Sequence, residues 1–258
     1  MNAGQVSYAR SEGVAHICFD RPHARNAMTW TMYEQLAEAC DRVNSDQEVR
    51  VAVFRGAGNQ AFVAGTDIAQ FREFRSADDG VEYERRIEAC LARIETLRVP
   101  SIAAIEGWAV GGGLAIAAAC DIRVATPESR FGVPIARTLG NCLSVPSLAL
   151  LTATFNVTAV KRMLLLGENL TAPEAHAAGF ITEIVSQPQF DARVAEFAAR
   201  MCGNAPITLR VTREAIRRLI RNAMPDGTDL LRECYGSEDF RIGVDAFVQK
   251  TVPRWKGR

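Results

Sequence analysis

Apolar residues recur along the first half of the chain in two alternating patterns. Short runs rich in β-branched residues predict strands over residues 14–19, 49–55, 101–105 and 122–125. Between them, apolar residues three and four positions apart predict helices after Thr29, over residues 81–97 and over residues 114–119. Thr29 fits the N-cap of the first helix, because its hydroxyl can accept a hydrogen bond from the first turn. Strands that alternate with helices predict an α/β architecture.

The second half of the chain has a different pattern. After about residue 147, strand-like runs are rare, with residues 179–185 the main exception. Residues 190–202 and 208–222 have the apolar spacing of amphipathic helices. We therefore divide the chain into a core of residues 1–203 and a C-terminal helical region of residues 204–258.

Composition narrows the class of protein. Of the 258 residues, 48% are hydrophobic and 23% are charged, as in ordinary globular proteins. Lys+Arg and Asp+Glu both number 30, which argues against a nucleic-acid or membrane partner bound by bulk charge. The N-terminal residues are polar, and no run of 18 apolar residues occurs, so we expect a cytoplasmic protein.

Cysteine and histidine give no sign of a metal site. The seven cysteines are scattered and contain no C-x-x-C, which favours reduced thiols over a zinc site or a disulfide framework. The three histidines, His16, His23 and His176, lie far apart. Dinucleotide, P-loop and nucleophile-elbow motifs are also missing from the sequence. We expect neither a metal nor a separate cofactor.

Two glycine-containing turns are the candidate chemistry. Residues 61–68 read AFVAGTDI and residues 106–113 read EGWAVGGG, and each follows a predicted strand, where α/β folds bind ligands. Glycine permits the unusual backbone angles that expose N–H groups. The second turn also opens a helix, whose free N–H groups favour negative charge in front of them. Two tight turns without a ligand are the alternative interpretation.

Several motifs in order resemble those of the crotonase family, also called the enoyl-CoA hydratase/isomerase family. They are RPHARNAM at 21–28, FVAGTDI at 62–68, AIEGWAVGGGL at 104–114, CDIR at 120–123, LLGENLTAPEAHAAGFI at 165–181, and GVDAFVQK at 243–250 with Trp255. The resemblance covers nearly the whole chain. It implies a spiral of ββα units with a C-terminal helical trimerisation region, and homotrimers that often pair into hexamers.

The resemblance also implies an acyl-CoA substrate, with coenzyme A present only as part of it. The family's oxyanion hole, formed by two backbone N–H groups, falls on Thr66 and Gly112. Its coenzyme A contacts fall on Ala24, Arg25, Ala64, Thr66, Asp67, Ile68 and Ala69, and on Leu231 and Lys250 in the C-terminal tail. From the residues alone, Asp67 also fits the N-cap of the following helix.

The sequence departs from the family at the two glutamates that move protons during hydration. Their positions are held by Ala115 and Ile135, and neither side chain can exchange a proton. Residues 131–144 should line the acyl pocket, where Asn141 and Cys142 are possible polar groups. Asn141 either binds a substrate oxygen or serves as a turn residue after Gly140. Cys142 either acts as a nucleophile or base, if its pKa is depressed, or fills a turn.

These observations leave three hypotheses. The first is an acyl-CoA enzyme that stabilises a thioester enolate, hydratase-like by similarity but without both usual glutamates. The second is a non-catalytic acyl-CoA-binding protein. The third is an acyl-CoA thioester hydrolase that uses a pocket water or Cys142.

Overall fold

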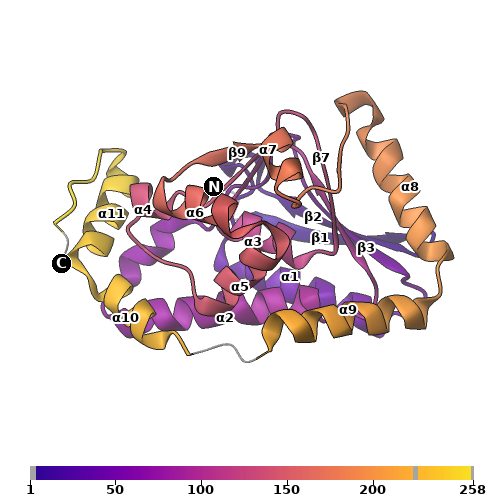
Figure 1. Ribbon diagram of the computed structural model, residues 1–258, viewed down its shortest axis with the longest axis horizontal. Helices are drawn as coiled ribbons and strands as arrows, with labels where there is room; N and C mark the ends of the chain where they lie inside the picture. The colour runs from indigo at the N-terminus through magenta and orange to yellow at the C-terminus, as the bar shows by residue number, and fades with distance from the viewer. Residues whose placement is uncertain (1–3, 223–225, 257–258) are drawn as a thin grey trace.

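The computed structural model describes residues 4–222 and 226–256, which form two β-sheets covered by helices (Figure 1). The larger sheet has the strand order β1-β2-β3-β5-β7-β10, and the smaller sheet has the order β4-β6-β8-β9. The larger sheet contains β1 (Gln5–Ser11), β2 (Val14–Asp20), β3 (Val51–Gly56), β5 (Ser101–Ile105), β7 (Ile122–Ala125) and β10 (Glu183–Ile184). The smaller sheet contains β4 (Ala61–Val63), β6 (Trp108–Val110), β8 (Arg130–Gly132) and β9 (Asn169–Thr171).

Successive strands enter the two sheets in turn, which makes the chain a spiral. β3, β5 and β7 are parallel neighbours in the larger sheet, and the strands that follow them, β4, β6 and β8, are parallel neighbours in the smaller one. A helix completes each turn: α2 (Ala77–Glu95), α3 (Gly112–Ala119) and α4 (Ile135–Thr138). This repetition confirms the predicted spiral of ββα units.

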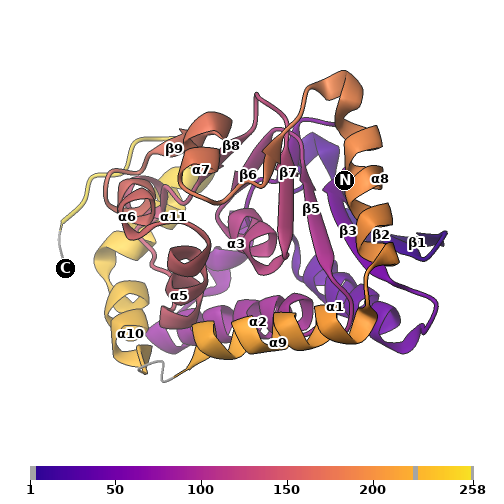
Figure 2. The same cartoon turned by 45° about the vertical axis from the view of Figure 1, so that its right-hand side comes forward.

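The central strands of the larger sheet are buried on both faces, and their side chains point alternately to one face and the other. Ala52 and Phe54 of β3 join the main core with α1 (Trp30–Ser45), α2 and α3. Val51 and Val53 face the opposite way and pack in a smaller cluster with α8 (Phe190–Gly203). Figure 2 shows α8 along this second face of the sheet. A sheet covered on both sides explains the nearly continuous apolar runs of its strands.

Local signals account for most element boundaries. Thr29 caps α1, since its side chain accepts a hydrogen bond from Met32 N at 3.3 Å. α2 begins four residues before the predicted start, because Ser76 and Asp79 form a capping box. The strand predicted over residues 179–185 shortens to β10. Gly179 (φ 89°) closes a turn just before it, and Phe180 and Ile181 enter the core instead.

The remaining helices complete the spiral and its C-terminal region. They are η1 (Pro22–Ala24), η2 (Ile68–Glu73), α5 (Val145–Thr154), α6 (Val157–Leu165), α7 (Ala172–Ala177), η3 (Gln187–Gln189), α9 (Pro206–Arg221), α10 (Thr228–Gly236) and α11 (Glu238–Gln249). Throughout the described ranges, every helix is too short or too polar to cross a membrane.

The C-terminal helices return to the core of the same chain. α10 packs against α2, and α11 packs against η2. The contact of α10 with α2 is close: a Cβ atom at Gly80 would lie 2.0 Å from the ring of Tyr235. α9 runs along α2 in both views (Figures 1 and 2) and has no buried residue. A separate domain of residues 204–258 stays a prediction.

Candidate active site

The two predicted glycine turns lie side by side. They follow β4 and β6 of the smaller sheet, and not the strands of the larger sheet that the sequence suggested. β4 and β6 are parallel neighbours, with Ala61 opposite Trp108 and Val63 opposite Ala109. Parallel strands end at the same edge of a sheet, so both turns emerge there together.

Glycine conformation orients the two candidate N–H groups. Gly65 has φ 98° and Gly111 has φ 55°, a region that glycine adopts without strain. Met28 pairs with the residues on either side of Thr66 (Met28 N to Gly65 O, 2.9 Å; Asp67 N to Met28 O, 2.8 Å), so Thr66 N–H points away from Met28. Within residues 4–222 and 226–256, neither Thr66 N–H nor Gly112 N–H has a hydrogen-bond acceptor.

The two turns also touch each other. A Cβ atom at Gly111 would lie 3.7 Å from Gly65 Cα, and one at Gly112 would lie 3.2 Å from Thr66 Oγ1. Gly112 is the first residue of α3, where helix N–H groups lack acceptors and the helix dipole favours negative charge. The arrangement suits an oxyanion that accepts from both N–H groups.

A buried cluster of hydroxyl groups holds the Thr66 turn in place. Thr66 Oγ1 lies 2.8 Å from Tyr33 Oη and 3.1 Å from Tyr83 Oη. Burial raises the pKa of both tyrosines, so they remain neutral. Tyr33 belongs to α1 and Tyr83 to α2, so both helices support the Thr66 turn.

The two turns open on one small cavity of about 150 Å³. Thr66, Gly111 and Gly112 line it. Most of its remaining wall is apolar and includes Ala64, Ile68, Phe71, Val110, Val133, Ile135, Leu139, Leu143 and Phe247. A concave apolar site with a few convergent polar groups is the usual form of a small-molecule site.

Glu84 of α2 also lines this cavity, although it is not among the site residues expected from the sequence. Its side chain accepts hydrogen bonds from Tyr235 Oη at 2.8 Å and from Ser144 N at 3.1 Å. Burial raises the pKa of Glu84 to about 7, although both hydrogen bonds favour the charged form. A signal was present: Glu84 precedes Ile87 by three positions, on the buried face of the helix.

Of the other residues considered for the acyl pocket, some line the cavity and some do not. Ile135 lines the cavity, whereas Ala115 is buried in α3 and is not part of the lining. Asn141 lines the cavity and donates from Nδ2 to Tyr235 Oη at 3.3 Å. Cys142 is not part of the lining, and its Sγ lies 3.9 Å from Leu230 O. A hydrogen bond with Cys234 and burial raise the pKa of the Cys142 thiol, so it is not a ready thiolate.

The first predicted coenzyme A segment lies against the Thr66 turn. Ala24 ends η1, and Arg25 O accepts from Ala64 N at 3.0 Å. Arg25 itself is exposed and lines an open depression of about 520 Å³.

Asp67 connects the Thr66 turn to the segment of residues 21–28. Its carboxylate pairs with Arg21 at 2.8 Å, and its Oδ1 caps η2 by accepting from Ala69 N at 3.1 Å. The capping role is the one expected from the sequence. Ile68 lines the cavity, whereas Ala69 is exposed.

The two tail residues lie in the C-terminal helical region. Leu231 is buried in the main core, where α10 meets α2. Lys250 is exposed at the C-cap of α11. In the described residues, no hydrogen bond or ion pair joins Lys250 to the Thr66 turn or to Arg25.

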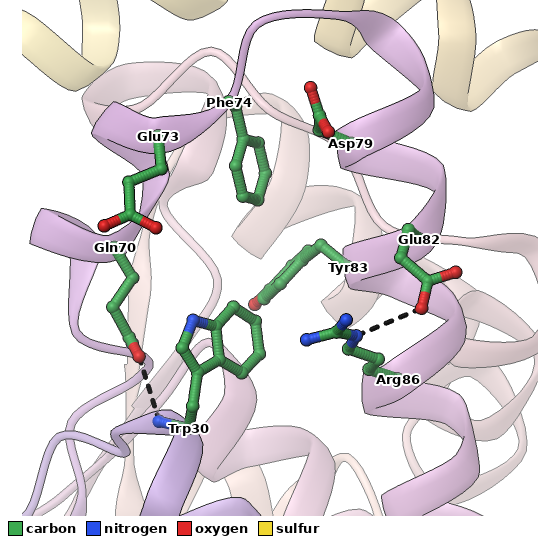
Figure 3. A pocket seen from close by; sticks show the side chains of 8 residues that line it. All are labelled: Trp30, Gln70, Glu73, Phe74, Asp79, Glu82, Tyr83 and Arg86. Carbon is green, nitrogen blue, oxygen red and sulfur yellow. Dashed lines mark hydrogen bonds and ion pairs between the residues drawn. The ribbon is translucent and has the colours of Figure 1, made fainter.

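A second pocket, of about 230 Å³, shares Tyr83 with the cavity. Figure 3 shows Tyr83 between Phe74 and Trp30, with Gln70 accepting from Trp30 N at 2.9 Å. The pocket carries three carboxylates, on Glu73, Asp79 and Glu82. Its lining contains neither Thr66 nor Gly112, so we place the candidate active site in the cavity. Among the described residues, no group of three potential metal ligands is close enough to hold an ion.

Comparisons with known proteins identify the family of the chain. Residues 9–258 match the family model described as Enoyl-CoA hydratase/isomerase. The chain therefore belongs to the enoyl-CoA hydratase/isomerase family. It is 28% identical to the short-chain-enoyl-CoA hydratase of Clostridium acetobutylicum, over 97% of each chain.

Solved structures show the same likeness. An enoyl-CoA hydratase/carnithine racemase from Magnetospirillum magneticum is 32% identical, with a TM-score of 0.81 over 100% of this chain and 97% of that one. A methylmalonyl CoA decarboxylase complexed with 2S-carboxypropyl CoA is 25% identical, with a TM-score of 0.89 over 98% of each chain. The fold is shared by proteins whose names describe different reactions.

Proposed function

We propose that this protein is an acyl-CoA enzyme that stabilises the enolate of a bound thioester. The observation that carries the proposal is the pair of unpaired N–H groups, of Thr66 and Gly112, at one small cavity. Donors aimed at a developing oxyanion are usually the largest single contribution to catalysis of this kind. In this arrangement both N–H groups donate hydrogen bonds to the thioester oxygen as negative charge moves onto it.

Coenzyme A is the proposed carrier of the acyl group. The names of the relatives describe enzymes that act on CoA thioesters. Arg25 offers an exposed cation for a phosphate beside the turn that contains Ala64. The cavity of about 150 Å³ is smaller than typical pockets for drug-sized ligands, roughly 300–1,000 Å³. We therefore propose a short acyl group.

The cavity favours proton-transfer chemistry over decarboxylation. Decarboxylation of a malonyl-type ester would place the substrate carboxylate in the same small cavity as Glu84. Two carboxylates at close range disfavour each other's charged forms. Hydration with a pair of glutamates is also disfavoured, because Ala115 and Ile135 hold their positions. Hydrolysis through Cys142 has little support, since Cys142 does not line the cavity.

Turnover of a panel of CoA esters tests the proposed function. Short enoyl-, hydroxyacyl-, malonyl- and aryl-CoA esters are incubated with the protein, and both the acyl product and free CoA are measured. We expect conversion of short acyl esters without release of free CoA. Stoichiometric release of CoA would show a hydrolase. Tight binding of the esters with no conversion of any of them would show a non-catalytic binding protein.

We also propose a trimer, or a dimer of trimers, with α9 in the interface. α9 exposes large apolar residues, among them Ile207 (69% exposed) and Leu219 (78%). Contiguous exposed apolar surface indicates an interaction site. Light scattering at micromolar concentration should give about three or six times the chain mass of 28.2 kDa.

A pair of variants of α9 sharpens this test. Leu219→Glu places a charge on the apolar stripe and should shift the protein to smaller species. Arg210→Glu, at an exposed position on the opposite side of the same helix, should leave the mass unchanged. A native protein that scatters as a monomer refutes the proposed assembly.

A further inference from the structure

Glu84 stands out because of its place in the cavity. Among the described lining residues it is the sole carboxylate, and only 2% of its surface is exposed. A buried carboxyl group in an apolar cavity is costly to keep unless it is hydrogen-bonded or has a function. The other titratable residue of the lining is Tyr83, which is already bonded to Thr66 Oγ1.

The hydrogen bonds of Glu84 fix its carboxyl group but do not use all of it. Oε1 accepts from Tyr235 of α10, and Oε2 accepts from Ser144 N, the N-cap residue of α5. A carboxylate oxygen has two lone-pair directions, so each oxygen keeps one free to accept. Asn141 Nδ2 in turn donates to Tyr235 Oη and so restricts the position of the tyrosine hydroxyl. Two separate segments, α10 and residues 141–144, thus position one carboxyl group.

The cavity brings Glu84 and the oxyanion donors to a common small space. Thr66, Gly112 and Glu84 line the same volume of about 150 Å³. A short acyl group bound there, with its carbonyl oxygen at the two N–H groups, has its first carbons close to every wall. Ile135 is part of the wall as well, but its side chain cannot accept a proton.

We propose that Glu84 is the catalytic proton-transfer group of this cavity, and that it moves the α-proton of a short acyl-CoA. This inference rests on the proposed function. The Cα–H bond breaks and its proton bonds to a Glu84 carboxylate oxygen. The electron pair of that bond forms the double bond between Cα and the carbonyl carbon, while the carbonyl π pair moves to the oxygen held by Thr66 and Gly112. Return of the proton to carbon reverses the step.

The electrostatics of the site agree with this role. A pKa of about 7 lets Glu84 accept and return a proton near neutral pH, where a general base works best. The titratable groups around Glu84 are Tyr83 and Glu88 of α2, Tyr33 of α1, Tyr235 and Cys234 of α10, and Cys142. None of them is a cation, so none favours the charged form of Glu84 by charge attraction. The base form grows as pH rises through about 7, and proton abstraction should rise with it.

Exchange of the α-hydrogens of butyryl-CoA with D₂O measures this step directly. Incorporation of deuterium is followed by mass spectrometry, and affinity for butyryl-CoA by calorimetry. We expect Glu84→Gln to slow exchange by about 100-fold or more, because general acid–base groups contribute roughly 10²–10⁴-fold. Its affinity should stay within a few-fold of native. Glu88→Gln, the same change one turn further along α2, should retain exchange.

The outcomes separate this inference from the proposed function. Native-like exchange in Glu84→Gln overturns the role of Glu84. A native protein that binds no butyryl-CoA overturns the proposed function instead. If Glu84→Gln folds poorly, the native pH profile decides: exchange must rise through about 7, and a flat profile refutes the proposal. Glu84→Asp, which keeps a titrating carboxylate, should retain measurable exchange.

Discussion

Replacement of Gly112 by proline is expected to lower the turnover of acyl-CoA substrates by about 10²–10³-fold, the usual effect of losing one oxyanion donor. Proline removes the backbone N–H and nothing else from the main chain. Gly112 is the first residue of α3, a helix position that proline accepts. The measurement is kcat and KM for the best ester of the panel. The loss should lie in kcat/KM, with the fold intact by circular dichroism.

Gly112→Ala is the matched control for this variant. Proline and alanine both add a Cβ atom, which would lie 2.7 Å from Tyr33 Oη and 3.2 Å from Thr66 Oγ1. Alanine, however, keeps the N–H. Any loss in Gly112→Ala therefore measures crowding by Cβ, and the further loss in Gly112→Pro measures the removal of the N–H together with the ring that replaces it. Equal losses in the alanine and proline variants would exclude Gly112 N–H as a donor.

Hydration of crotonyl-CoA is expected to be very slow in the native protein and to rise when glutamates are restored. Ala115→Glu together with Ile135→Glu restores the family's pair of carboxylates, and a proton-transfer group in the cavity wall at position 135 is worth roughly 10²–10⁴-fold. Ile135 lines the cavity, so a carboxylate there faces a bound acyl group. Hydration is measured as the loss of the conjugated thioester absorbance. The rate is normalised to folded protein, because an unpaired carboxylate in this apolar wall is destabilising.

The double glutamine variant, Ala115→Gln with Ile135→Gln, is the control for side-chain bulk. It should show no gain in hydration, since an amide does not exchange protons in this way. A native protein that already hydrates crotonyl-CoA at about 100 turnovers per second, well above a typical enzyme rate, would contradict the expectation. Glu84→Gln, Asn141→Ala and Cys142→Ala would then be assayed for the residue responsible.

The α/β architecture was predictable because buried strands form short apolar runs and amphipathic helices repeat apolar residues three and four positions apart. The spiral of ββα units was implied only by the resemblance of the motifs to those of the family. The smaller sheet was not predictable, since β4, β6, β8 and β9 are each three residues long, too short to show a period. The glycine motifs therefore located the Thr66 and Gly112 turns in the sequence. The strands that we expected before them, however, belong to the larger sheet, whereas the turns follow β4 and β6. β1 was also missed, as most of its residues are exposed.

Glu84 shows a second reason why the site could not be predicted fully from the sequence. Its partner Tyr235 lies 151 positions away, and nothing in the local pattern of α2 indicates that α10 returns to pack there. Glu84 shares the helix face of Ile87 and Leu91, so the pattern did indicate burial. It did not indicate that a cavity opens at that point, since a cavity depends on how several segments pack. Cys142 is the opposite case. It belongs to the segment expected to line the pocket, but its thiol turns toward Cys234.

Main-chain donors have a consequence for how such a protein diversifies. The N–H groups of Thr66 and Gly112 are positioned by the pairing of β4 with β6 and by the conformations of Gly65 and Gly111. No side chain supplies them, so substitutions around the cavity that spare the support of the two turns leave the proposed oxyanion hole in place. A new reaction then requires only a change in the groups that handle protons or contact the acyl chain. Descendants of one ancestor can thus keep the same enolate chemistry while they relocate its acid or base to another helix.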